Sequence, residues 1–299
     1  MTTVVTTSYG PTNANGPTLQ QYINDVRRLL HDSTGKYWTD ADLTANINKA
    51  RLRTIADTSC NRQLQVLALS SGVEAYSLGG VTGAIISSGG SGYSPATSIT
   101  FDSTFGSGAT ATPVIADGVI ADIRVLTPGH YSSTPAMTIT DSGGGSGAVA
   151  QPTWLDINSM DVVNITVLWG NWRVVLDRWA FTKFQAYARA WTSFTYYPTV
   201  WSNYGQSTWY IGPIPAQSYL SEWDTVVKPT DLVLLTDIDQ QIADAYASPV
   251  PYYAARWAKF QEQGFQEAEM FDRMYQQQVQ RTLRAVMLRK LPSAYNAGP

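Results

Sequence analysis

Residues 92–100 read Gly92-Tyr93-Ser94-Pro95-Ala96-Thr97-Ser98-Ile99-Thr100, and the chain returns to this pattern at His130-Tyr131-Ser132 and Pro135-Ala136-Met137-Thr138-Ile139-Thr140. Two glycine segments repeat with the same offset of 38–40 residues: Gly106-Ser107-Gly108-Ala109 and Gly145-Ser146-Gly147-Ala148. Self-similarity at a fixed period is typical of duplicated structural units. Short β-prone runs lie between the glycine turns, at Ala84–Ser87, Thr97–Phe101, Val119–Leu126 and Met137–Thr140. Residues 72–152 are therefore predicted to form an inserted all-β repeat domain, although their low complexity alone would also fit disorder.

Helical patterns occupy the chain on both sides of this insertion. Thr18 is a plausible N-cap for a helix with apolar residues at helical spacing, and Thr39 is a second one, with Asp40 and Asp42 in the first turn. Residues 248–251 are expected to break a helix that ends near Ala247. A last helical pattern runs from Tyr252, and Gly264 either divides it into a hairpin or lies within one long helix.

The middle of the chain is rich in aromatic residues. Val162–Trp169 and Trp172–Leu176 flank a Gly-Asn turn and predict a hairpin, a helix is expected from Trp179 to Trp191, and short strands between Val200 and Val227. We therefore expect an α+β protein. Residues 17–71 and 153–290 would form an α-helical bundle core with a small β-hairpin and strand region. Residues 1–16 and 291–299 would be a flexible arm and a flexible tail.

Composition excludes several classes of function. The formal net charge is −3 and no block of Lys or Arg stands out, so the footprint of a dedicated nucleic-acid binder is missing. The single cysteine, Cys60, cannot form an internal disulfide and is expected to be a buried, inert thiol. The first residues resemble no signal peptide, so assembly in a cytoplasm is expected. The 10 Trp and 17 Tyr fit either an aromatic core or an interface.

No pattern of residues indicates catalysis. His31 and His130 are the only histidines, and neither belongs to a triad or metal-ligand motif; His130 is expected in a β-turn. Four carboxylates near the C-terminus are interleaved with basic residues and Gln, which favours a solvated or inter-subunit face: Glu262, Glu267, Glu269 and Asp272. We therefore expect a protein that is not an enzyme, with no catalytic residues, cofactor or metal.

A basic run closes the helical part of the sequence, with Arg281, Arg284, Arg289 and Lys290. These side chains either complement the helix dipole or form a patch that faces an acidic partner or DNA. The following tail keeps two anchor residues, Leu291 and Tyr295, between Pro, Gly and Asn. Such a tail is expected to become ordered upon contact with a partner.

Residues 17–60 and 155–290 resemble the head-to-tail adaptor (connector) proteins of tailed bacteriophages, particularly short-tailed ones. The resemblance rests on element order and on two loose motifs, Tyr37-Trp38-Thr39-Asp40-Ala41-Asp42-Leu43 and Trp209-Tyr210-Ile211-Gly212-Pro213-Ile214-Pro215. The insertion is similar to Gly-rich repeat modules of phage virion proteins. The resemblance implies a structural subunit of the virion neck, assembled in the host cytoplasm, that forms a homo-oligomeric ring, typically twelve-fold, through which genomic DNA passes.

The same resemblance implies the partners. These are the portal protein, the tail tube, nozzle or tail-fibre proteins, and DNA in transient contact within the channel, with no membrane. The candidate portal-binding residues are Arg284, Arg289, Lys290, Leu291 and Tyr295. The alternative is a virion protein that binds carbohydrate or the host surface through the β insertion, although the insertion has few aromatic residues to stack on sugars.

Overall fold

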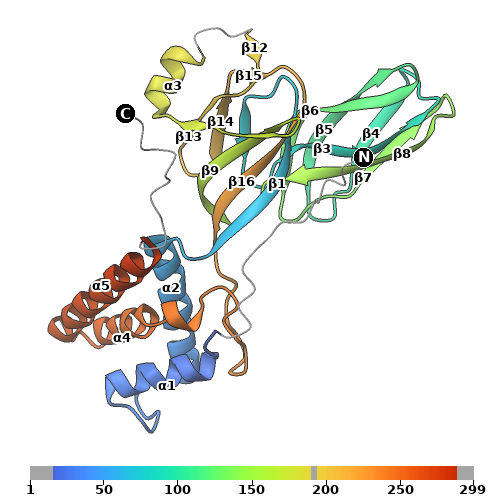
Figure 1. Cartoon of the computed structure of the whole chain (residues 1–299). Coiled ribbons are helices and arrows are strands. Elements are labelled where there is room, and N and C mark those ends of the chain that lie inside the picture. Colours follow the sequence, from blue (N-terminus) through green and yellow to red (C-terminus); the bar gives the residue numbers. More distant parts are fainter. Residues whose placement is uncertain (1–15, 190–193, 288–299) are drawn as a thin grey trace. The chain divides into compact units, whose positions relative to one another are not determined.

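The computed structural model describes residues 16–189 and 194–287 (Figure 1). The chain divides into two compact units: a β unit that contains residues 63–227, and a helical unit within Gly10–Arg62 and Lys228–Pro299. The prediction of an α-helical bundle core is wrong, because strands make up 40% of the structure and helices 28%. In particular, the described residues between 153 and 227 form strands and one short helix, α3 (Phe181–Tyr187), rather than part of a helical bundle.

Two four-stranded sheets form a sandwich in the β unit. The first sheet has the order β1-β16-β9-β10, and the second has the order β11-β13-β14-β2. The bounds in the first sheet are Arg62–Leu69 (β1), Tyr219–Val227 (β16), Ser159–Trp169 (β9) and Trp172–Val175 (β10). Those in the second are Asp177–Arg178 (β11), Val200–Tyr204 (β13), Thr208–Gly212 (β14) and Ala75–Ser77 (β2). A short parallel pair adds Thr195–Tyr196 (β12) and Ile214–Pro215 (β15).

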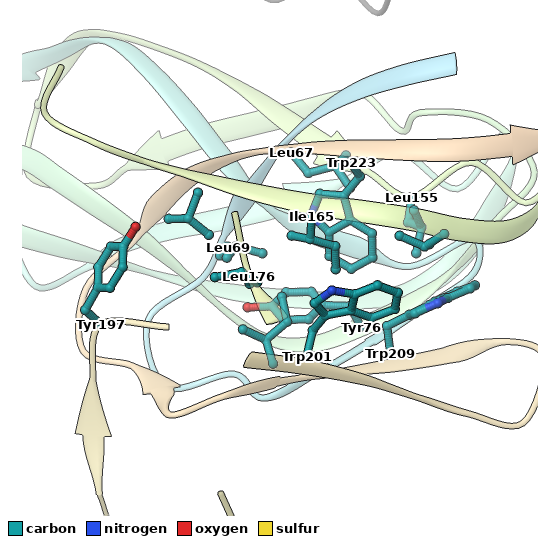
Figure 2. Packing of buried hydrophobic residues seen from close by; sticks show 13 residues of the cluster. Leu67, Leu69, Tyr76, Leu155, Ile165, Leu176, Tyr197, Trp201, Trp209 and Trp223 are labelled. Carbon is teal, nitrogen blue, oxygen red and sulfur yellow. The ribbon is translucent and has the colours of Figure 1, made fainter. Parts of the chain in front are cut away.

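Three tryptophans from different strands fill the space between the two sheets (Figure 2). Trp223 comes from β16, whereas Trp201 and Trp209 come from β13 and β14; all three are buried. An aromatic side chain of this size removes on the order of 150–250 Å² from water, so these rings dominate the hydrophobic core. Trp223 donates its indole N–H to Ser221 Oγ at 2.9 Å, and Ser221 donates in turn to the Leu67 carbonyl at 2.8 Å. The predicted hairpin is confirmed as β9 and β10.

The Gly-rich insertion folds as a nested set of antiparallel strands, drawn in green in Figure 1. The innermost pair is β5 (Gly106–Ala116) with β6 (Val119–Tyr131), joined by the turn Asp117-Gly118. Around it lie β4 (Thr97–Phe101) with β7 (Met137–Asp141), and then β3 (Val81–Ser91) with β8 (Ser146–Trp154). Strands form where the sequence predicted them within residues 84–140, whereas β2, which falls in the predicted insertion 72–152, belongs to the second sheet of the sandwich. We call residues 81–154 the repeat module.

Equivalent residues of the two repeat copies form equivalent hydrogen bonds. Tyr93 and Tyr131 occupy equivalent positions, and each hydroxyl oxygen accepts a backbone N–H from the other copy of the repeat. The donors are Ala148 to Tyr93 at 3.1 Å and Ala109 to Tyr131 at 3.2 Å. Gly145 leaves room for the Tyr93 ring, since a Cβ there would lie 2.7 Å from the ring. The repeated Tyr and Gly residues therefore pack each half of the module onto the other half.

Four α-helices make up most of the helical unit. They are α1 (Leu19–Leu30), α2 (Asp40–Thr58), α4 (Pro249–Gln261) and α5 (Phe265–Met287), with the 3₁₀ turn η1 (Asp244–Tyr246) before α4. Both predicted N-caps are confirmed: Thr18 forms a capping box with Gln21, and Thr39 accepts from the Asp42 N–H. Gly264 divides the C-terminal pattern, so α4 and α5 form a hairpin.

The expected helix ending near Ala247 is wrong. The described chain there forms only the 3₁₀ turn, and Pro249 begins α4 instead of following a helix. Proline is tolerated at the first helical position, because its missing N–H would have no intrahelical partner there. The prolines of residues 249–251 therefore start a helix rather than end one.

Candidate interaction surface

The two histidines and the single cysteine lie in different elements of the described structure. No group of three or more His, Cys, Asp or Glu side chains could hold a metal ion in the ranges 16–189 and 194–287. His31 is the left-handed C-cap of α1, and His130 lies in strand β6 rather than in the expected turn. Burial raises the pKa of the half-buried Cys60 thiol, which makes the reactive thiolate harder to form.

The four carboxylates near the C-terminus are each paired with a cation. Glu262 and Glu267 both lie 3.0 Å from the Lys259 ammonium. Glu269 is 3.0 Å from Arg273, and Asp272 is 3.0 Å from Arg256. These ion pairs lie on the α4–α5 hairpin, and Glu262 and Glu267 are brought together by the Lys259 ammonium that they share.

An exposed apolar loop is the most unusual feature of the helical unit. Residues 232–238, which we call the apolar loop, connect β16 to η1 and read Leu-Val-Leu-Leu-Thr-Asp-Ile. Val233 and Leu234 are 73% and 63% exposed, and Leu235 and Ile238 are also exposed. Several adjacent apolar side chains in water are costly, and such patches mark surfaces that bind a partner.

Hydrogen bonds hold the backbone of this loop in place. The Asp237 carboxylate accepts the Val233 and Leu234 N–H groups, both at 2.8 Å, and these bonds lower its pKa. The first N–H groups of α1 donate to loop carbonyls, Leu19 to Asp237 at 3.0 Å and Gln20 to Leu235 at 3.1 Å. The exposed side chains are thus presented on a fixed backbone, which lowers the entropy cost of binding a partner.

Helix α2 holds the other side of the apolar loop. The Asn48 side chain pairs with the Leu232 backbone like a neighbouring strand, donating to its carbonyl and accepting from its N–H, both at 3.0 Å. This two-point contact uses both hydrogen-bonding groups of the amide. The two hydrogen bonds between Asn48 and Leu232 fix the distance between α2 and the apolar loop.

A fully buried ion pair anchors the end of the loop. Arg51 of α2 donates to both oxygens of Asp239, at 2.7 and 2.8 Å, and neither side chain is exposed. The Tyr22 hydroxyl of α1 donates to the same carboxylate at 3.1 Å, and burial raises the pKa of this phenol. A third Arg51 contact goes to the Thr230 carbonyl at 2.7 Å. This network joins α1, α2 and the loop segment.

A groove separates α2 from the loop segment. Its volume is about 780 Å³, and its lining is mostly apolar. One wall is the exposed face of α2, with Ala41, Ala45 and Leu52, and the other includes Val233 and Leu235. We call it the α2 groove. Concave apolar surfaces of this size are typical binding sites.

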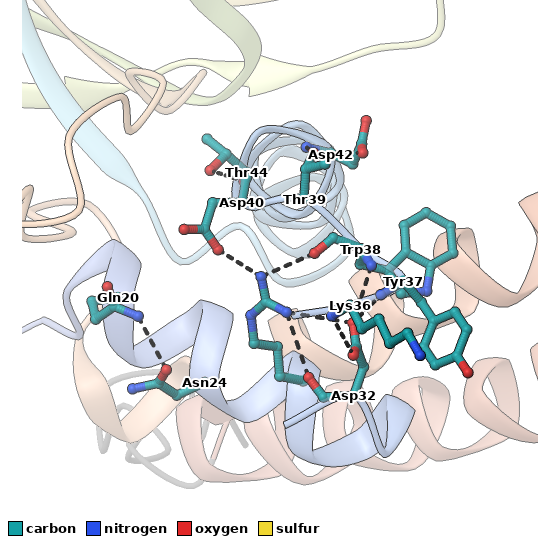
Figure 3. A network of polar contacts seen from close by, with 11 residues as sticks. Gln20, Asn24, Asp32, Lys36, Tyr37, Trp38, Thr39, Asp40, Asp42 and Thr44 are labelled. Atoms are coloured by element: carbon teal, nitrogen blue, oxygen red, sulfur yellow. Dashed lines mark hydrogen bonds and ion pairs between the residues drawn. The ribbon is translucent and has the colours of Figure 1, made fainter. Parts of the chain in front are cut away.

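The turn between α1 and α2 is a second rigid element of this unit (Figure 3). Asp32 accepts three backbone N–H groups, from Lys36, Tyr37 and Trp38, at 2.9–3.2 Å. Burial alone would raise the pKa of the Asp32 carboxyl, but these bonds and the nearby Arg27 lower it below its ordinary value. Trp38 then donates its indole N–H to Glu262 at 3.0 Å, which ties the turn to the end of α4.

The α4–α5 turn presents two exposed phenylalanines, Phe260 and Phe265. Their rings lie 5.4 Å apart in an edge-to-face arrangement, and Phe265 is 58% exposed. We call this pair the Phe tip. Helix packing continues behind it, where Tyr275 of α5 is buried and donates to Asp57 of α2 at 2.8 Å.

The β unit has its own exposed aromatic edge at the β9–β10 hairpin. Trp169 and Trp172 are paired across the two strands, and Trp172 is 77% exposed. Tyr197 stacks on Trp169 with 4.5 Å between ring centroids. Part of the aromatic surplus therefore forms the predicted core, whereas the predicted interface role of the exposed rings stays a prediction.

Of the predicted portal-binding residues, only Arg284 lies within the described residues. It is exposed on the last turns of α5, as expected for a basic surface residue. Arg289, Lys290, Leu291 and Tyr295 lie outside the described residues, so their role stays a prediction. The sequence analysis missed the apolar loop and the α2 groove. The run Leu232–Leu235, between Asp231 and Thr236, was the signal for the loop, but four consecutive apolar residues equally fit a short buried strand.

Neither a comparison with protein-family models nor one with curated proteins finds a match to this sequence. In the described residues, no helix is long and apolar enough to cross a membrane.

Proposed function

We propose that this chain is a structural, non-enzymatic subunit of a phage virion: a head-to-tail adaptor that forms a ring between the portal and the tail. In this role it lets genomic DNA pass, acts in the virion neck after assembly in the host cytoplasm, and contacts tail proteins at its other end. The resemblance of residues 17–60 and 155–290 to connector proteins is the starting point of the proposal.

The observation that carries the proposal is the rigid apolar loop beside the α2 groove. A monomeric soluble protein rarely presents so many adjacent apolar side chains on a backbone fixed by hydrogen bonds. A subunit of a ring needs such surfaces, because each copy must bind two neighbours as well as the portal and the tail. The ion-paired carboxylates and the capping role of His31 further favour an assembly role over catalysis.

The carbohydrate-binding alternative receives less support from the repeat module. Tyr93 and Tyr131 are buried in its interior, and the one exposed aromatic residue of the described module is Phe105. Recognition of sugars by stacking needs exposed aromatic faces. Glycan binding by the full chain therefore stays a prediction, and the arrangement of aromatic residues in the module does not favour it.

Native mass spectrometry and negative-stain imaging of the full-length chain, alone and mixed with the purified portal of the same phage, test the proposal. We expect a closed ring in at least one of the two samples, together with co-sedimentation with the portal. A chain that remains monomeric in both and does not co-sediment would contradict the adaptor function.

A further inference from the structure

We propose that the Phe tip of one copy occupies the α2 groove of the next copy in the ring. This inference rests on the proposed function and names the contact that closes the ring. It joins an aromatic projection of the α4–α5 turn to an apolar groove between α2 and the apolar loop.

The Phe tip and the α2 groove are formed by different elements of the helical unit, and Trp257 lies between groove-lining Lys49 and Phe260. In Figure 1 the α4–α5 turn lies on one side of α2 and the segment that follows β16 lies on the other. Neither Phe260 nor Phe265 lines the groove of its own chain, so a Phe tip in the groove comes from another copy. A ring is built from heterologous contacts, in which two different faces of each copy meet. The tip and the groove are two such faces on one unit.

The chemistry of the two surfaces matches. Phe260 and Phe265 project apolar rings, and the groove offers the apolar side chains Ala45, Leu52 and Leu235. Aromatic side chains seated in apolar pockets are the usual anchors of protein interfaces. Both surfaces lie on fixed backbones, so little conformational entropy is lost when they meet.

Charges at the edges of the two surfaces are opposite in sign. At the groove, Lys228 and Lys49 make no ion pair with any described residue, although the Lys49 ammonium lies 5.4 Å from the centre of the Trp257 ring. Asp231 is the remaining carboxylate, because Asp40 is bound to Arg27 at 2.7 Å. The edge of the α2 groove therefore carries two cations and one carboxylate. At the tip, Glu262 and Glu267 share Lys259, so two carboxylates stand against one cation. Complementary charge steers association and fixes the register of the contact.

Disulfide trapping tests the contact in the full-length chain. In a Cys60→Ser background, Ala45→Cys places a thiol in the groove and Gln266→Cys places one next to Phe265; both native residues are exposed. The double variant, oxidised after ring assembly, is expected to give a ladder of covalent oligomers up to the size of the ring. Each single variant is expected to stay monomeric on a denaturing gel, because the contact joins two different faces.

The matched control is the pair Ala45→Cys and Gln277→Cys. Gln277 is an exposed residue of the same type on α5, displaced by about 16 Å along the helix at 1.5 Å per residue. This pair is expected to give no ladder. Dimers from Ala45→Cys alone, or equal ladders from both pairs, would overturn the inference.

A second measurement distinguishes failure of this contact from failure of ring formation in general. Phe265→Ser is expected to raise the concentration at which rings dissociate by about tenfold or more, as for a buried aromatic anchor. Met270→Ser, which changes another exposed apolar residue of α5, is expected to leave it unchanged. Normal rings without a ladder and with an inert Phe265→Ser would sink this contact while the adaptor function stands. Failure of the parent chain to form rings, alone or with the portal, would sink both.

Discussion

At the scale of single residues, the helical unit depends on a few buried polar groups with complete hydrogen bonding. Asp239 is the clearest case, because its two oxygens accept from Arg51, Tyr22 and the backbone N–H groups of Gln241 and Ile242. A charge buried in this way is tolerated only because every lone pair direction has a donor. Removing one partner leaves the other charge without compensation.

We therefore expect Asp239→Ala to destabilise the helical unit by roughly 3–5 kcal/mol, the usual cost of breaking a buried ion pair. Urea denaturation followed by far-UV circular dichroism would measure the change. The matched variant Asp57→Ala removes the partner of an ion pair with the more exposed Arg53, and its effect should be clearly smaller, although it also removes a hydrogen bond from Tyr275. Equal losses for both variants would contradict the anchoring role of Asp239.

Two tyrosines of the repeat module can be tested by single substitutions in the same way. Tyr131→Phe keeps the ring but leaves the Ala109 N–H without its acceptor, so we expect a loss of about 1–3 kcal/mol in module stability. Tyr93→Phe should have a similar effect through Ala148, because the two positions are related by the repeat. Tyr187→Phe, on an exposed residue, is the control and should change stability little. Thermal unfolding of the full chain is the measurement. An unchanged unfolding temperature in both Tyr→Phe variants of the module would argue against a stabilising role for the two hydroxyl groups.

At the scale of elements, Asp141 at the end of β7 contributes to the pH dependence of the module, together with Asp102, whose pKa is lowered by the Thr104 hydroxyl. The Ser94 hydroxyl and then the Gly145 N–H donate to the Asp141 carboxylate and lower its pKa below the ordinary value of 3.8. A lowered pKa contributes stability that is present above pH 3.8 and is lost as the pH falls through the folded-state pKa. Asp141→Asn should therefore weaken the module at neutral pH and flatten its loss of stability in acid. Unfolding curves at several pH values would measure both effects, and an unchanged acid slope would count against this role.

The boundary of the module is also a property of elements. Val81 and Trp154 are paired across β3 and β8, so the two ends of the module lie side by side. Replacing residues 82–153 with a short Gly-Ser linker, which keeps Val81 and Trp154, should keep the sandwich folded, with the fluorescence of its buried Trp residues unchanged. Replacing residues 72–152 instead removes β2 and the buried Tyr76, and should unfold the sandwich. If both replacements leave the Trp signal intact, β2 is dispensable for the sandwich.

The fold could be predicted wherever the information is local. The caps at Thr18 and Thr39 predicted α1 and α2, and the repeat predicted the strands of the insertion. The sandwich was assigned to a helical core because its pairing is not local. Strand β1 near residue 65 lies beside β16 near residue 225, and no period in either segment indicates the other. The α2 groove could not be predicted for the same reason, since the hydrogen bonds between Asn48 and Leu232 span 184 residues.

At the scale of the whole molecule, portal attachment and ring formation are expected to be separable. Arg284 is exposed on α5 and lies outside both the Phe tip and the α2 groove. Arg284→Glu, combined with Lys290→Glu, should weaken co-sedimentation with the portal and leave ring formation unchanged, because only a basic surface toward an acidic partner is reversed. Arg173→Glu, on the β unit, serves as a charge control. If this double variant binds the portal normally, Arg284 and Lys290 do not contribute to portal attachment.

The nested pairing of the repeat module also gives it an order of folding. The turn Asp117-Gly118, with positive φ at both residues, favours the β5–β6 hairpin, which can close without any distant contact. Once it has formed, β4 and β7 are brought close, and their pairing in turn brings β3 to β8. Each step closes only a short additional loop, so the entropy cost of joining Val81 to Trp154 is divided among three small steps. We expect the strand pairs of the module to form in the order β5–β6, β4–β7 and β3–β8. Strands β2 and β9, which flank the module in the sequence, would join the sandwich last.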